Sequence, residues 1–152
     1  MLKIHYFLTQ MTDINFYVSK QEGWGNRLVI VHRLVTLATQ HKLAIHIHTN
    51  NENESKSLDD FLWKHQKSSF FPHTILAKND SQLKTEISIG HDFEPMENCD
   101  YLINTSSERP EYFSRYLKVA EILDKNEEIL TAGRKRYAFY KERGYTLGYH
   151  QL

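Results

Sequence analysis

The chain has 152 residues, 40% of them hydrophobic and 25% charged, and its 19 basic and 19 acidic residues cancel. This composition is typical of a soluble globular protein, here one domain over residues 1–152, and the neutral charge argues against a protein that coats polyanions with its whole surface. The single cysteine, Cys99, excludes an internal disulfide and fits a reducing compartment. Neither a signal peptide nor a membrane-spanning apolar run is recognisable, so we expect a cytoplasmic protein without membrane contact.

Apolar, β-favouring runs recur along the chain and predict strands. In chain order these are Leu2–Leu8, Leu43–His48, Phe70–Leu76, Glu86–Ile89, Asp100–Asn104 and Leu117–Leu123. Helical patterns separate them: one capped by Asn26 with apolar Leu28, Val31, Val35 and Ala38, one from Ser57 or Asp59, a short one at Pro110, and Glu127–Lys141. An aromatic tail, residues 143–152, follows. This alternation predicts an α/β fold with a mostly parallel sheet covered on both faces.

Motifs for nucleotide or metal chemistry are weak. The turn after the first predicted strand, Thr9–Asp13, has no glycine, and neither a G-x-G-x-x-G nor a P-loop pattern occurs. His46 and His48 alternate on a strand and could hold a metal ion with His41, which would suit a small α/β enzyme. Histidines hydrogen-bonded locally under a helix are the better-supported interpretation. Cys99 lacks the signature of a nucleophile, so no catalytic residue and no cofactor are predicted.

The helix Glu127–Lys141 carries the clearest functional signal. From Arg134 to Arg143 there are five cations and one anion, with aromatic residues among them. Arg134, Tyr137 and Lys141 follow i, i+3, i+7 spacing and therefore share one face. A run of like charges is often only a solvated face. An aromatic surface beside fixed cations also suits an acidic peptide with an apolar end, or a nucleic-acid backbone.

A second candidate surface lies in the middle of the chain. Trp63 ends a predicted helix, and Phe70, Phe71 and Pro72 follow a loop. Adjacent strand residues point to opposite faces, so the two phenylalanines cannot both enter one core. Trp and Phe exposed beside proline would form a protein-binding patch.

The segments LWKHQKSSFFPH and GRKRYAFYKERGYTL together make the chain resemble the chi subunit of bacterial DNA polymerase III holoenzyme over most of its length. The resemblance implies a Rossmann-like three-layer fold without nucleotide binding and a non-catalytic role in DNA replication. It implies two partners: the psi subunit, which links chi to the clamp loader, and the acidic C-terminal tail of single-stranded-DNA-binding protein, and through it single-stranded DNA. By resemblance Trp63, Phe70, Phe71 and Pro72 would contact psi. The tail would contact Leu123, Arg134, Tyr137 and Lys141.

Two positions of the basic helix depart from the family pattern. Leu130 and Ala138 stand where the best-known members have basic residues, and Lys135, Arg136 and Arg143 are the cations available to compensate. The sequence leaves two other functions open. One is a direct single-stranded nucleic-acid-binding module that uses the same helix, and the other is an enzyme built on the His46/His48 face.

Overall fold

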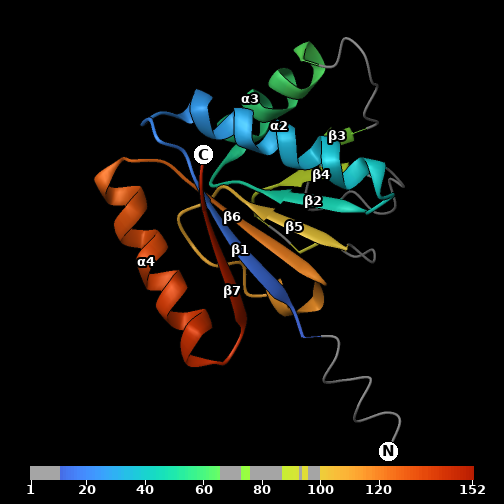
Figure 1. Ribbon diagram of the computed structural model, residues 1–152. Helices are drawn as coiled ribbons and strands as arrows, with labels where there is room; N and C mark the ends of the chain where they lie inside the picture. The colour runs from blue at the N-terminus through green and yellow to red at the C-terminus, as the bar shows by residue number, and fades with distance from the viewer. Residues whose placement is uncertain (1–10, 66–72, 76–86, 93, 96–99) are drawn as a thin grey trace, which may run out of the picture.

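The computed structural model describes residues 11–65, 73–75, 87–92, 94–95 and 100–152 (Figure 1). In the described residues seven strands form one sheet in the order β3-β4-β2-β5-β6-β1-β7, and every described pairing is parallel. The strands are β1 (Asp13–Val18), β2 (Ile45–His48), β3 (His73–Ile75), β4 (Ile87–Gly90), β5 (Tyr101–Asn104), β6 (Lys118–Leu123) and β7 (Thr146–Gln151). The predicted α/β class with a parallel sheet is confirmed.

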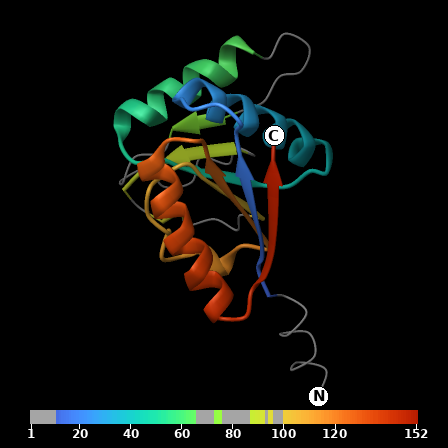
Figure 2. The same ribbon diagram turned by 60° about the vertical axis from the view of Figure 1, so that its left-hand side comes forward.

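Helices cover both faces of the sheet. Helices α2 (Trp24–Gln40) and α3 (Glu52–Lys64) pack on one face, while α4 (Glu127–Glu142) and a 3-10 turn, η1 (Phe113–Arg115), pack on the other. Figure 2 shows α4 and the two other helices on opposite sides, with β7 along one edge. The three-layer arrangement predicted from the resemblance is thus present.

Strand β6 shows how the sequence creates two cores. Successive side chains of a strand point to opposite faces, so Ala120 and Ile122 join the core under α2 and α3. Val119 and Leu123 join the core under α4. Glu121 points the same way as these two, and it is fully buried (0% exposed). A charged residue therefore occupies the centre of the interface between α4 and the sheet.

A hydrogen-bond network from several elements satisfies the Glu121 carboxylate. Its Oε1 accepts from Arg136 Nε at 3.0 Å and from Asn104 Nδ2 at 2.9 Å, and its Oε2 accepts from the Tyr140 hydroxyl at 2.7 Å. Burial raises the pKa of Glu121, and the Arg136 guanidinium, with the Tyr140 and Asn104 donors, counteracts that shift. Arg136 Nη1 also donates to the Ser107 carbonyl at 2.8 Å. The network fixes α4 to β6 and to the loop after β5.

Two helices begin earlier than the sequence patterns indicated. Helix α2 begins at Trp24 after Gly23, whose φ of 134° favours glycine, so the prediction that Asn26 caps this helix is wrong. Helix α3 begins after Asn51, not at Ser57 or Asp59, and the Asn51 side chain accepts from Glu54 N at 2.9 Å. Glu54 reaches back to Asn50 N. This arrangement resembles a capping box, and its Asn-x-x-Glu spacing is visible in the sequence.

The sequence patterns did not predict β1 and β7, which lie beside each other at one end of the sheet. The strand predicted at Leu2–Leu8 lies outside the described residues, whereas β1 occupies Asp13–Val18. Residues 143–152 are not merely an aromatic tail, because β7 forms there and pairs with β1. Gly144, with a φ of 80°, ends α4 and turns the chain back toward the sheet.

The Arg136–Glu121 pair yields a stability prediction. Replacing Arg136 by Met leaves Glu121 buried without its cation, which should lower the free energy of unfolding by about 3–5 kcal/mol. Lys135→Met, on the adjacent exposed residue, should change it by less than about 0.5 kcal/mol. Urea denaturation followed by circular dichroism measures both, and equal stability of the two variants would contradict the role of the pair.

Candidate functional site: a pocket between α4 and the sheet edge

A pocket of about 230 Å³ lies between α4 and the edge strands of the sheet. Sheet residues form its floor, residues of one side of α4 form its wall, and the edge strand closes it. The lining residues are Phe16, Leu123, Leu130, Gly133, Arg134, Tyr137 and Tyr149. A cavity of about 150 Å³ holds a benzene ring in a protein core, so this pocket has room for a phenyl side chain.

The first turn of α4 is positioned by the end of β6. Asn126 caps the helix, and its side chain accepts from Glu128 N and Ile129 N. Asp124, which is also buried, accepts from Asn126 N at 2.8 Å, from Gly23 N at 3.0 Å and from Arg27 Nε at 3.1 Å. One carboxylate thereby ties the start of α4 to the start of α2. The helix that forms the wall of the pocket is consequently fixed at its start by Asp124, and further along by the bond between Arg136 and Glu121.

The structure brings together three of the four residues predicted for tail binding. Leu123 is 3% exposed at the pocket floor, and Tyr137 is half-buried with its ring 5.3 Å from the Phe16 ring at 61°. Arg134 is exposed and lines the same pocket. Lys141 is exposed near the end of α4, one turn beyond Tyr137, and does not line the pocket. An apolar slot thus lies beside a guanidinium group.

The three cations considered as compensation behave differently. Arg136 is 5% exposed and bound to Glu121, so it cannot compensate at the pocket rim. Lys135 lines a broader hollow on the other side of α4, with Glu108, Glu127 and neighbouring residues. Arg143 lies over Phe139, 3.6 Å from the ring centroid. The Arg109 guanidinium lies equally close at 3.6 Å, and two groups cannot share one face, so they sandwich the ring.

Sequence reasoning missed four residues of the pocket: Phe16, Leu130, Gly133 and Tyr149. Leu130 was noted only as a departure from a basic pattern, yet it contributes an apolar wall. Gly133 gave a visible signal, because a glycine inside a helix lowers its stability and therefore often has a packing reason. A Cβ at Gly133 would lie 2.6 Å from Leu123 Cδ1. The missing side chain lets α4 lie against the pocket floor.

The second predicted surface is only partly described. Trp63 lies at the end of α3 and is 48% exposed, as expected for a contact residue. Phe70, Phe71 and Pro72 lie outside the described residues. Since α3 and α4 cover opposite faces of the sheet, Trp63 is on the other side of the molecule from the pocket (Figure 1). Trp63 and the pocket are therefore separate.

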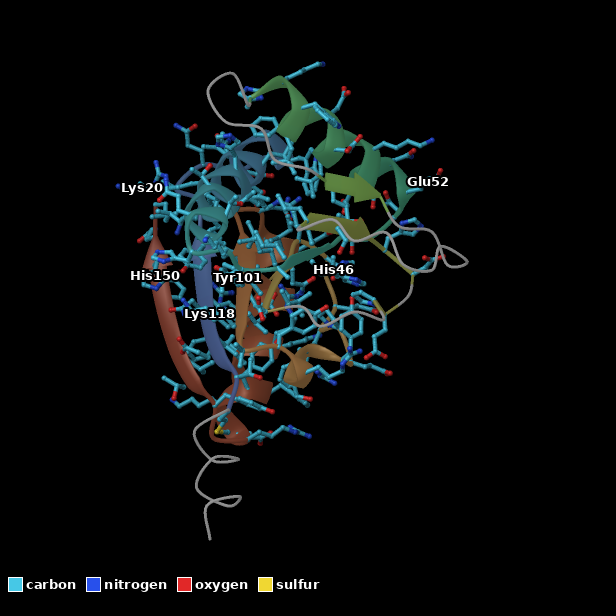
Figure 3. All side chains as sticks on the ribbon, turned by 90° about the vertical axis from the view of Figure 1, so that its right-hand side faces the viewer. Lys20, His46, Glu52, Tyr101, Lys118 and His150 are labelled. Carbon is cyan, nitrogen blue, oxygen red and sulfur yellow. The ribbon has the colours of Figure 1, made fainter. Side chains whose placement is uncertain are left out.

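On the face that His46 and His48 share, each histidine lies within hydrogen-bond distance of a hydroxyl group. His46 Nδ1 lies 2.7 Å from Ser88 Oγ, and His48 Nδ1 lies 3.0 Å from the Tyr112 hydroxyl. Figure 3 shows His46 inside the molecule at the sheet. Burial, with a smaller effect of His48, lowers the pKa of His46 to about 3. The described residues contain no group of three or more His, Cys, Asp or Glu suited to a metal ion.

The turn after β1 is also different from the one inferred from sequence. It spans residues 19–23 and not Thr9–Asp13, and it does contain a glycine, Gly23. Gly25 follows at G-x-G spacing, but Leu28 stands where the third glycine of a dinucleotide motif would be. The Gly23 N–H donates to Asp124, a carboxylate of the protein itself.

Comparison with known proteins places the chain in a family. The family model "DNA polymerase III chi subunit, HolC" matches residues 11–148. A protein named DNA polymerase III subunit chi from Pseudomonas aeruginosa is 31% identical over 93% of this chain and 98% of its own. One of the same name from Haemophilus influenzae is 26% identical over 66% of this chain and 70% of its own. In the described residues no helix has the length and apolarity to cross a bilayer.

A solved structure supports the fold alone. The crystal structure of T4 UvsW aligns with a TM-score of 0.61 and 9% identity over 95% of this chain and 42% of that one. At such identity only the architecture is comparable.

Gly133→Ala tests the close approach of α4 to the pocket floor. The added Cβ must displace Leu123, so we expect a loss of about 1–3 kcal/mol in unfolding free energy, despite the better helix propensity of alanine. Gly25→Ala, in α2 with nothing within 4 Å of its added Cβ, is the matched control. It should be neutral or stabilising by up to about 1 kcal/mol. Thermal unfolding that ranks the two variants the other way would contradict the packing.

The pH dependence of stability tests the state of His46. Its pKa is about 3 in the folded protein, against an ordinary value of 6.5 for an exposed histidine, so the unfolded chain binds the proton more readily between these values. The contribution of the neutral His46 to the free energy of unfolding should be fully present above about pH 6.5 and should be lost as the pH falls. From His46 alone, the free energy of unfolding should decrease by about 2 kcal/mol between pH 7 and pH 5. A His46→Gln variant should show a flatter curve in urea denaturation. Parallel curves for wild type and variant would exclude a buried neutral His46.

Proposed function

Because the chain belongs to the DNA polymerase III chi subunit family, we propose that it is a non-catalytic adaptor of the holoenzyme's clamp-loader assembly. It binds the acidic C-terminal tail of single-stranded-DNA-binding protein through the α4 pocket and the psi subunit through the Trp63 surface. Its association with single-stranded DNA is indirect, through the coating protein, and it works in the cytoplasm.

The pocket is the observation that carries the tail-binding part of the proposal. The tail ends in proline and phenylalanine and contains aspartates, so it needs an apolar slot and cationic donors. Leu123, Tyr137 and Phe16 supply the slot. Arg134 lines the pocket and is exposed, so its guanidinium can engage the terminal carboxylate in bidentate fashion. Lys141, one turn further along α4, is placed to attract the acidic residues that precede the phenylalanine.

Support for the psi contact is of a different kind. It comes from the family resemblance and from the exposure of Trp63, a residue type that often anchors protein interfaces. Phe70, Phe71 and Pro72 remain predictions by resemblance. Trp63 lies on α3, which covers the opposite face of the sheet from α4, so we expect the pocket to stay accessible when psi is bound.

Direct binding of single-stranded nucleic acid by α4 is the alternative. It requires several cations on one surface. Arg134 and Lys135 line different hollows, and Arg136 is buried against Glu121. The cations therefore diverge around the helix, which favours a compact peptide site over a continuous phosphate track.

The neighbouring cations Arg134 and Lys135 give a matched test of the proposal. Arg134→Ala should weaken binding of a labelled tail peptide about 10- to 100-fold, because a charged anchor at the pocket is lost. Lys135→Ala, on the other side of α4, should change affinity less than about three-fold. Fluorescence anisotropy at two salt concentrations measures both, and the wild-type affinity should fall at the higher salt.

Two controls complete this experiment. A peptide without the final phenylalanine should not bind, and Trp63→Ala should retain tail binding while losing affinity for psi. If Arg134→Ala bound the tail as wild type does, Arg134 would be removed from the site. Retention on single-stranded DNA without any tail binding would favour the nucleic-acid alternative.

A further inference from the structure

Strand β7 is an edge strand that lacks the features by which edge strands commonly avoid pairing with another chain. Of the described strands, only β1 pairs with it, so its other side carries backbone groups that no described strand covers. Edge strands are commonly guarded by charges, proline or short length. The other edge, β3, has three residues, whereas β7 has six, and its sequence TLGYHQ contains no Lys, Arg, Asp, Glu or Pro. Its side chains are mostly exposed along the strand.

The backbone direction of each β7 residue follows from the end of the strand. Leu152 N donates to the Val18 carbonyl at 2.9 Å, and the Leu152 carbonyl accepts from Lys20 N at 2.9 Å. Both polar groups of Leu152 therefore point to the β1 side. In a parallel pair, alternate residues share this direction. The N–H and C=O groups of Leu147, Tyr149 and Gln151 consequently point away from β1, to the open edge.

Tyr149 connects this edge with the pocket. Its side chain is 57% exposed and lines the pocket together with Leu123, Arg134 and Tyr137. Its backbone N–H and C=O point outward from the sheet. A chain whose last side chain entered the pocket would thus have hydrogen-bonding groups of β7 directly beside it.

The charges near this edge suit an acidic chain. Arg134 stands at the pocket, and Lys20 is bonded through its backbone to the last residue after β7. Figure 3 shows Lys20 and His150 along the same edge of the sheet, on the side of β7. No acidic side chain belongs to β7 itself.

We propose that the tail of single-stranded-DNA-binding protein binds as an added strand along β7, with its final aromatic ring in the pocket. The inference rests on the tail-binding function proposed above and deepens it. Backbone pairing gives affinity that does not depend on the tail's exact sequence, while the pocket and Arg134 give specificity for its end. An extended acidic peptide would gain hydrogen bonds at an edge that no described strand covers.

Single N-methyl groups on the backbone of the tail peptide test this pairing. In an added strand alternate N–H groups point to β7, so methylation there should weaken binding about five-fold or more, as expected for a lost hydrogen bond. Methylation of the intervening positions should be tolerated. Proline at the penultimate position already lacks a donor, so the scan begins before it. Uniform tolerance would overturn strand addition.

A variant of the protein provides the complementary test. Gln151→Pro removes one outward N–H without removing a bond to β1, and should weaken the tail peptide severalfold, whereas Gln151→Ala should not. Amide exchange measured by NMR should show Leu147, Tyr149 and Gln151 becoming protected on peptide binding. Gly148 and His150, which face β1, should be protected already in the protein alone.

The outcomes separate the two levels of the proposal. If the unmodified peptide binds and needs its phenylalanine, but the outward amides stay unprotected, strand addition is wrong and the adaptor function stands. If the unmodified peptide does not bind at all, the tail-binding function fails and the inference fails with it.

Discussion

Two buried carboxylates of one short stretch of chain determine where α4 lies. Glu121 in β6 binds Arg136 and Tyr140 of the helix, and Asp124 just after β6 binds Asn126 at the helix start and Arg27 of α2. Burying charge is unfavourable unless partners are fixed in place, so these contacts allow little variation in the position of α4. The pocket between α4 and the sheet exists only because that position is fixed.

Three consecutive cations show what the sequence could and could not reveal. Arg134, Lys135 and Arg136 are similar in the sequence, yet each has a different environment. Arg134 lines the pocket, Lys135 lines the hollow on the other side of α4, and Arg136 is buried in the core. Helical periodicity correctly placed Arg134 and Tyr137 on one face. It could not identify Arg136 as buried, because its partner lies fifteen residues away on another element. The lone acid in the apolar strand KVAEIL was the sequence signal that such a partner was needed.

Most of the fold followed from the alternation of apolar runs, whereas the edge did not. Strands β2, β4, β5 and β6 are buried on both faces along most of their length, as is typical of a parallel sheet, and they were predicted within a few residues. Strand β7 lies at the periphery, with mostly exposed side chains and one glycine, so its pattern was indistinguishable from a tail. The pocket depends on β7 through Tyr149, and it was therefore incomplete when inferred from sequence alone.

The arrangement of layers has a consequence for the proposed adaptor function. Trp63 is on α3, and the pocket is beside α4 on the opposite face, with the sheet between them (Figure 1). Two partners bound at these places would contact opposite faces of the sheet. Each contact then raises the effective concentration of the other partner, so a weak and salt-sensitive tail contact can still hold the assembly on coated DNA.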